Sequence, residues 1–236
     1  VALIDIGGGT TDLAIFRDGI IRHTAVIPFG GNVITEDIKE GCSIIEKQAE
    51  LLKIKFGSAW PGENKDNEIV SIPGLRGRDP KEITLKNLSK IIHARVVEII
   101  EQVYVEIKNY GHEEQKKKLI AGIVLTGGGA QLKHLKQLVE YITGMDTRVG
   151  FPNEHLAGDS DDAITSPLFA TAVGLVMDGL KRQERVKAEA VVEEVTEEIE
   201  VLEEEEAVQE ETKPKQKRTF LDALTERVKD FLDNAE

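Results

Sequence analysis

The residues best suited to chemistry stand in the run DIGGGTTD, at positions 5–12 of this 236-residue chain. An apolar stretch ends in Asp5 and then turns through three glycines and two threonines. Consecutive backbone N–H groups in such a turn converge on an anion, usually a phosphate, and threonine hydroxyls add donors. Asp5 stands where a carboxylate can hold Mg²⁺ through water. The alternative is a tight hairpin that needs glycine only for a positive φ, which one glycine would satisfy. The predicted phosphate contacts are Gly7, Gly8, Gly9, Thr10 and Thr11.

A second glycine run, LTGGGAQL, follows a near-continuous apolar stretch over residues 119–126 and precedes a helical pattern. A glycine-rich turn between strand and helix is a weak signal by itself, since many α/β folds contain one. Two such turns at the carboxyl ends of neighbouring strands can face one crevice. One turn could then hold phosphates, while the other lets a nucleoside lie flat on bare backbone. The second turn consists of Gly127, Gly128 and Gly129.

The elements that position these turns alternate between strands and helices. Asp18-Gly19 predicts a hairpin between residues 12–17 and 20–28, and Ser43 with Glu46 predicts a capping box at the start of a helix. The pattern further predicts helices over 30–41, 43–57, 84–110, from about 131, and over 167–182, with strands over 1–6, 68–72, 119–126 and near 147. This order predicts an α/β fold with a helical, partly stranded insertion over about 31–118.

Charge is concentrated in one segment near the C-terminus. The chain carries a net charge of −13, of which residues 184–211 contribute −11 through 13 acidic and 2 basic side chains. This composition predicts a disordered linker over 183–218 and argues against nucleic acid as the partner. The single cysteine, Cys42, excludes a disulfide framework and is expected to be a buried apolar side chain rather than a reactive thiol.

Several stretches together resemble the bacterial FtsA family of the actin-like ATPase superfamily. DIGGGTTDLAIF resembles the superfamily's second phosphate motif, and VLTGGGAQL resembles its adenosine motif. The stretches IPFGGNVITEDI, AELLKIKFG, GLRGRDPKEIT, IIHARVVEII and ATAVGLVMDGL resemble that family in order and spacing. The resemblance covers nearly all of residues 1–182. Since the chain opens in mid-strand, we expect it to be the second half of a longer protein and, without the first phosphate motif, to hold nucleotide weakly.

The resemblance implies an actin-like, ribonuclease-H-like fold that binds ATP and Mg²⁺, with Asp5 near the metal. It places Glu50 and Lys53 beside the ribose and adenine; without it, they read as an exposed helical ion pair one turn apart. It also implies that Arg95 and Glu98, with Lys90, bind the C-terminal peptide of FtsZ. A solvated charged stripe is the alternative for that set.

The last 18 residues form an amphipathic pattern. At 100° per residue its apolar positions fall within an arc of about 120°; they are Phe220, Leu221, Leu224, Val228, Phe231 and Leu232. Basic residues over 213–218 precede it, so we predict a helix over 219–236 that lies on anionic membrane lipid. The alternative is a helix that folds back on the domain or binds a partner protein.

The resemblance thus implies a cell-division protein at the cytoplasmic face of the inner membrane. It would polymerise as an actin-like filament, tether the FtsZ ring and contact other divisome proteins. The residues offer no convincing general base, so any ATPase activity should be slow. The alternatives are a sugar or acyl kinase, an Hsp70-like ATPase and a pilus-assembly ATPase of the same superfamily. The acidic linker and amphipathic end argue against all three.

Overall fold

The computed structural model describes residues 1–65, 67–74, 79–111, 119–153, 156 and 164–187. Its strands are β1 (Ala2–Ile6), β2 (Thr11–Arg17), β3 (Ile20–Ile27), β4 (Ile69–Ile72), β5 (Lys81–Thr84), β6 (Ile123–Thr126) and β7 (Thr147–Val149). Its α-helices are α1 (Gly31–Cys42), α2 (Glu46–Phe56), α3 (Leu85–Asn109) and α4 (Leu135–Thr143), followed by a helix over residues 170–187. Short 3₁₀ turns are η1 (Pro61–Glu63), η4 (Gly128–Gln131) and η5 (Pro167–Phe169).

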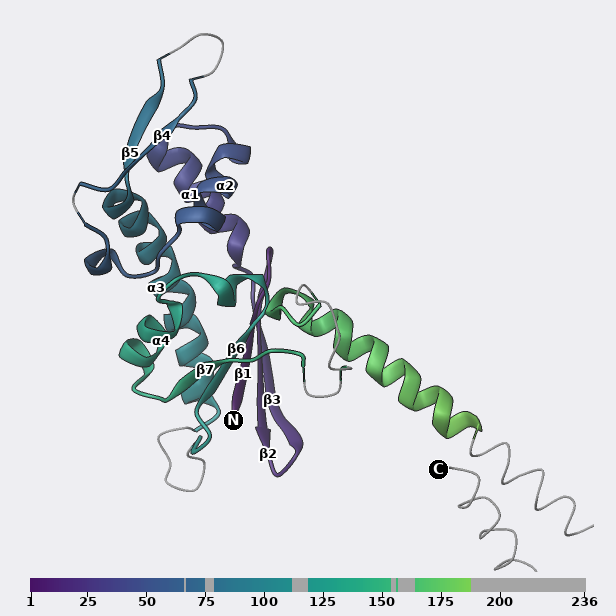
Figure 1. Ribbon diagram of the computed structural model, residues 1–236. Helices are drawn as coiled ribbons and strands as arrows, with labels where there is room; N and C mark the ends of the chain where they lie inside the picture. The colour runs from purple at the N-terminus through teal and green to yellow at the C-terminus, as the bar shows by residue number, and fades with distance from the viewer. Residues whose placement is uncertain (66, 75–78, 112–118, 154–155, 157–163, 188–236) are drawn as a thin grey trace, which may run out of the picture. The chain divides into compact units, whose positions relative to one another are not determined.

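A five-stranded sheet in the order β3-β2-β1-β6-β7 forms the centre of the first compact unit, Val1–Met177 (Figure 1). β1, β2 and β3 form an antiparallel meander, whereas β6 and β7 run parallel to β1. Asp18 and Gly19 both have positive φ, as the predicted two-residue hairpin requires. The carboxyl ends of β1 and β6 therefore meet at one edge of the sheet, and each strand runs into a glycine turn.

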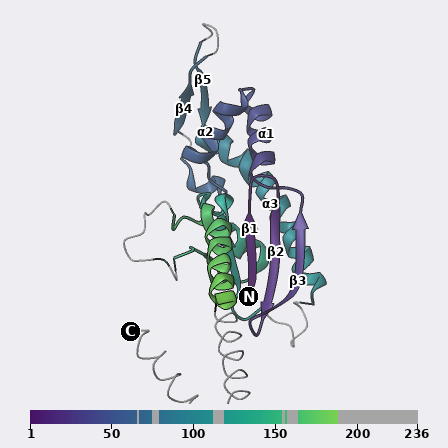
Figure 2. The same cartoon turned by 90° about the vertical axis from the view of Figure 1, so that its right-hand side faces the viewer.

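α3 and α4 cover one face of this sheet (Figure 2). α3 begins where the Thr84 hydroxyl accepts a hydrogen bond from the N–H of Asn87, which supplies the N-cap. Apolar residues then recur every three or four positions, and most are buried, whereas the expected apolar position Ile91 is half-buried. The buried apolar residues of α3 are Leu88, Ile92, Val96, Ile99, Ile100, Val103 and Ile107. They join the buried face of the sheet, including Ile4 and Leu125, in one apolar core.

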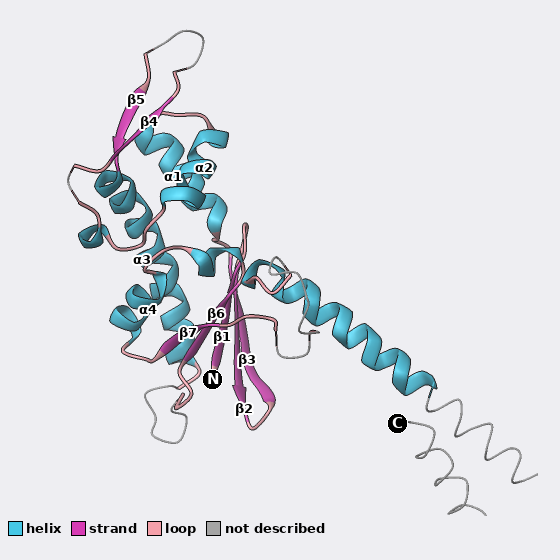
Figure 3. Cartoon of the chain, viewed as in Figure 1, coloured by secondary structure: helices cyan, strands magenta, loops and turns pink. Residues whose placement is uncertain are grey.

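The insertion between β3 and β6 carries α1, α2 and the two-stranded sheet β4-β5 (Figure 3). Arg95 of α3 fixes α1 against it: its Nε and Nη2 donate to the two carboxylate oxygens of Asp37 at 2.6 and 3.0 Å. Trp60 contacts the ring of Tyr141 on α4 edge-on at 5.5 Å between centroids. Within the insertion, α1 is thus fixed to α3, and the loop that carries Trp60 contacts α4.

One local prediction was wrong, and one strand was not predicted. Ser43 and Glu46 form no capping box, because Ser43 ends α1 in a left-handed conformation and Ile45 occupies the N-cap of α2. The sequence also gave no signal for β5, a four-residue strand whose pairing with β4 starts one residue before α3.

The second compact unit begins at Asp178, and its described part, residues 178–187, is helical. The predicted end of that helix, near residue 182, is exceeded by five residues. Most of the predicted linker over 183–218 and the whole predicted helix over 219–236 lie outside the described residues. Among the helices that are described, none is long and apolar enough to cross a membrane.

Candidate nucleotide site

The first glycine turn presents bare backbone to solvent at the end of β1. The N–H of Gly7 closes the turn by donating to the carbonyl of Thr10 at 2.9 Å, and residues 8–10 are exposed. Among the described residues, no acceptor is found for the N–H groups of residues 8–10. A Cβ built on Gly9 meets no atom within 4 Å. The turn therefore has the unpaired donors and the open space that an approaching anion requires.

The hairpin alternative is not supported by the backbone angles. None of Gly7, Gly8 and Gly9 has a positive φ. Glycine is therefore not required there by the conformation of the turn. Gly8 and Gly7 instead make close contacts within the protein, with Asn32 and with the Thr10 carbonyl, while Gly9 borders open space.

The second glycine turn packs directly against the first. Gly127 has φ of 81° and ψ of 172°, and a Cβ on it would lie 2.2 Å from Asp5 Oδ1 and 2.6 Å from the Ile6 carbonyl oxygen. A Cβ on Gly129 would lie 2.4 Å from Ile6 Cγ2. These two glycines allow β6 and its turn to approach β1, so the two turns lie beside each other at the same edge of the sheet.

Asp5 lies between the two turns. Its Oδ2 accepts a hydrogen bond from the Thr171 hydroxyl at 2.9 Å. Thr126 stands opposite Asp5 in the parallel register, and its hydroxyl is the one buried side-chain polar atom without a partner among the described residues. A buried hydroxyl without a partner costs free energy, so water or a ligand polar group is expected to satisfy it. Sequence reasoning missed both threonines: Thr126 directly precedes Gly127 in the second run but was not singled out, and Thr171 lies outside both runs.

Thr11 does not have the role that the sequence predicted. Its side chain is fully buried, and its hydroxyl donates to the Phe29 carbonyl at 2.8 Å. Thr10 remains exposed and donates to Asp12 at 2.9 Å. Thr11 therefore joins β2 to the chain before α1, and Thr10 is the hydroxyl within reach of a ligand.

Gly30 and Gly31 belong to the same site, although the sequence analysis assigned them only to a helix. The N–H groups of Gly31 and Asn32, at the start of α1, donate to the carbonyls of Gly7 and Gly8 at 2.9 and 2.8 Å. A Cβ on Gly30 would lie 2.6 Å from the Gly7 oxygen. The glycine pair thus lets α1 hold the first turn by its carbonyls, leaving the N–H groups of residues 8–10 outward. The sequence feature that could have identified Gly30 and Gly31 as part of the site is the GG dipeptide directly before a helical pattern.

Glu50 and Lys53 of α2 lie one helical turn apart and are paired, with Lys53 Nζ 2.7 Å from Glu50 Oε2. Lys53 also donates to the Gly31 carbonyl and to Thr35 Oγ1, each at 2.8 Å. Burial raises the pKa of Glu50, but hydrogen bonds from Lys53 and Thr35 and the charge of Lys53 outweigh it, so the pKa lies below its usual value. Glu50 is therefore a carboxylate at neutral pH. The pair is partly buried against α1, unlike the exposed ion pair that was the alternative.

The predicted peptide-binding residues lie on α3, away from the glycine turns in sequence and in contacts. Arg95 uses three of its five N–H groups, two on Asp37 and one on Glu98 at 2.6 Å. Lys90 is exposed. The described residues contain no group of three or more His, Cys, Asp or Glu side chains placed to hold a metal.

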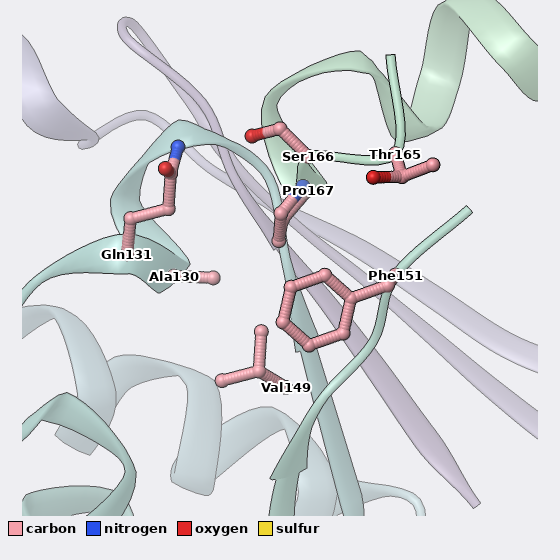
Figure 4. A pocket seen from close by; sticks show the side chains of 7 residues that line it. All are labelled: Ala130, Gln131, Val149, Phe151, Thr165, Ser166 and Pro167. Carbon is pink, nitrogen blue, oxygen red and sulfur yellow. The ribbon is translucent and has the colours of Figure 1, made fainter. Parts of the chain in front are cut away.

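A separate hollow of about 340 Å³ lies beside the second glycine turn, at the end of β7 (Figure 4). Figure 4 shows the Phe151 ring between Val149 and Pro167, facing Ala130. Asp5 and the first glycine turn are not among the residues that line it. The hollow therefore lies beside the second turn and does not extend to Asp5 or to the first turn.

The residues of the crevice fit a nucleoside phosphate. The unpaired N–H groups of residues 8–10 suit phosphate oxygens, while the Thr10 hydroxyl donates its one proton to Asp12. The unpartnered Thr126 hydroxyl is open to a hydrogen bond, and Glu50 supplies an acceptor near α1. Asp5 supplies one hard oxygen ligand of the kind that Mg²⁺ binds through water.

Comparison with solved structures gives the class of protein. The crystal structure of MreB5 of Spiroplasma citri bound to ADP superposes with a TM-score of 0.60 at 25% identity, covering 79% of this chain and 55% of that one. A PilM–PilN type IV pilus biogenesis complex superposes with a TM-score of 0.56 at 20% identity, over 75% of this chain and 45% of that one. The fold is that of the actin-like ATPases, as the sequence predicted.

The chain belongs to the family described as "Cell division protein FtsA", which matches residues 2–174. It is 37% identical over 183 residues to that protein of Pseudomonas aeruginosa, covering 78% of this chain and 43% of the relative. It is 40% identical over 176 residues to that of Neisseria meningitidis, covering 75% and 42%. The chain thus spans less than half the length of the curated relatives it matches.

Proposed function

We propose that this chain binds ATP in the crevice between the two glycine turns and acts as the second half of an FtsA-like tether for the division ring. The observation that carries the proposal is the exposed, unpaired backbone over residues 8–10, where Gly9 borders open space and the carbonyls of Gly7 and Gly8 accept hydrogen bonds from the start of α1. Binding rather than turnover is the proposed role. Membership of the cell-division family and the ADP-bound MreB5 relative support it.

Gly9→Ala tests nucleotide binding. The added methyl group meets no atom of the protein within 4 Å, so the fold should survive, but the methyl occupies the space through which a phosphate reaches the backbone. Loss of one hydrogen bond to a charged group costs about 1.5–3 kcal/mol, which corresponds to a loss of about 10- to 100-fold in ATP affinity. Isothermal titration calorimetry at millimolar ATP measures this loss.

Gly174→Ala is the matched control. A Cβ there also meets nothing within 4 Å, but Gly174 lies in the last helix and not in either glycine turn. The Gly174→Ala variant should bind ATP with the same affinity as the parent chain. Equal affinities in all three proteins would refute the proposed phosphate contacts.

We further propose that α3 binds the C-terminal peptide of FtsZ through Lys90, Arg95 and Glu98. Arg95 keeps two N–H groups beyond those used on Asp37 and Glu98, and Lys90 is exposed. Lys90→Ala should weaken binding of a fluorescent FtsZ peptide several-fold without lowering the melting temperature. Lys136→Ala on α4 is the control, and equal effects of both variants would contradict the assignment.

The membrane part of the proposal rests on the sequence of residues 219–236. A single short amphipathic helix binds weakly, so polymerisation would multiply its attachment. The chain should pellet with anionic vesicles, and Phe231→Glu should abolish pelleting. If neither protein pellets at any lipid charge, the helix is a protein-docking segment and the tether proposal fails.

A further inference from the structure

We infer that Thr35 is a positioning residue that fixes Glu50 as the acceptor for the ribose hydroxyls of the bound nucleotide. The inference rests on the proposed nucleotide binding, and it concerns a residue that lies in neither glycine turn. Thr35 is in α1, one helical turn after Gly31, and is 4% exposed.

Thr35 joins α1 to the Glu50–Lys53 pair of α2. Its hydroxyl donates to Glu50 Oε2 and accepts a hydrogen bond from Lys53 Nζ at 2.8 Å. The same hydroxyl lies 3.1 Å from the Gly31 carbonyl, to which Lys53 also donates. The cluster is closed by the contact of 2.7 Å between Lys53 and Glu50. Gly31, Thr35, Glu50 and Lys53 thus form one cross-brace, and Gly31 is part of the first glycine turn's support.

The hydrogen bonds within this cross-brace leave only some polar atoms of Lys53 and Glu50 without a partner, and only those atoms can bind a ligand. Lys53 has three N–H donors, and all three have acceptors within it: Gly31, Thr35 and Glu50. The Lys53 side chain is 15% exposed, so Lys53 holds Gly31, Thr35 and Glu50 together rather than binding phosphate. Both bonds to Glu50 end on Oε2, and Oε1 has no partner among the described residues. One carboxylate oxygen is therefore held, and the other is free to accept.

A held carboxylate with one free oxygen suits a neutral diol. Carboxylates accept hydrogen bonds from ribose hydroxyls in other nucleotide sites, and a preorganised acceptor loses less rotamer entropy on binding. Thr35 fixes the orientation of the Glu50 carboxylate, because it lies on α1 and donates to a side chain of α2. Without the hydroxyl, Glu50 keeps Lys53 but can rotate with it toward solvent, since the Glu50 side chain is 42% exposed.

The test compares ATP with 2′,3′-dideoxy-ATP by calorimetry on the full chain. The parent should prefer ATP by about ten-fold, the value of one hydrogen bond to a charged group. Thr35→Val, which removes the hydroxyl at constant shape, should reduce that preference to about two-fold or less, chiefly by weakening ATP. Thr35→Ser, which keeps the hydroxyl, should retain the parent's preference.

A pH profile separates positioning from a structural effect. Glu50 is faced by Lys53 from its own helix and by Thr35 and the Gly31 carbonyl from α1. Because the hydroxyl stabilises the carboxylate, its removal should move the low-pH loss of the preference for ATP over the dideoxy analogue to a higher pH; protonation of the triphosphate is common to both nucleotides and cancels in that ratio. Circular dichroism checks folding, and Thr35→Ala replaces the valine variant if the latter does not fold.

The outcomes separate the two proposals. If the parent binds neither nucleotide, the proposed nucleotide site is wrong. If the parent binds both but the variants lacking the hydroxyl keep its preference and its pH profile, the site stands and the role of Thr35 is wrong.

Discussion

Gly127→Ala should destabilise the protein strongly, in contrast to the tolerated Gly9→Ala. The new Cβ would lie 2.2 Å from Asp5 Oδ1 and 2.6 Å from the Ile6 oxygen, and Gly127 has φ of 81°. A non-glycine residue in this backbone region costs about 1–3 kcal/mol. Forcing a methyl group into a packed site adds about 1–3 kcal/mol. The total, about 2–6 kcal/mol, is a large fraction of a typical domain's stability.

Thermal unfolding followed by circular dichroism measures this effect. For a unit of 177 residues, each kcal/mol lowers the melting temperature by about 2–4 °C, so we expect a decrease of at least about 4 °C. Gly9→Ala should melt within about 1 °C of the parent, as expected for a surface change away from packed groups. If Gly127→Ala melts like the parent, then β6 and its turn do not approach β1 as described, and the shared crevice is wrong.

Three further predictions concern the packing around the site. Ser89 is buried and donates to the Ser58 carbonyl at 2.7 Å, so Ser89→Ala should lower the free energy of unfolding by about 1–3 kcal/mol in urea titration, because that carbonyl loses its partner. Burial raises the pKa of the Cys42 thiol, so the folded chain should react with Ellman's reagent at pH 7.5 much more slowly than the urea-unfolded chain; equal rates would contradict its burial. Asp37→Ala leaves two donors of the partly buried Arg95 unpaired and should cost about 1–3 kcal/mol, whereas Asp37→Glu should recover part of the loss in the same titration.

The elements with strong periodic or turn signals could be predicted from the sequence. The apolar face of the long helix and the Asp18-Gly19 hairpin depend on local spacing, and the structure confirms both, except that Ile91 is half-buried and Ile100, outside the expected set, is buried. The capping box failed because Ser43 is used to end α1, and a pattern of two residues cannot tell the end of one helix from the start of the next.

The sequence was enough to predict which backbone turns face a ligand, but not which side chains from other elements contact them. The glycine runs identified the backbone that faces a ligand, and β1–β6 pairing brought them together. Thr11 was misjudged because alternation within β2 points its side chain into the core, a fact of register and not of residue type. Thr35 and Thr171 were missed because each reaches the site through a contact between elements apart in the sequence. Thr126 was missed because nothing in the sequence shows that its hydroxyl is buried without a partner.

Titration of the ¹⁵N-labelled chain with ATP, followed by amide chemical shifts, tests the central claim most directly, because it detects weak binding and locates it. The account predicts the largest shifts at the N–H groups of Gly8, Gly9 and Thr10, with smaller ones at Gly31 and Glu50. Shifts centred instead on Phe151 and Ala130 of the separate hollow, or no shifts at millimolar ATP, would contradict it.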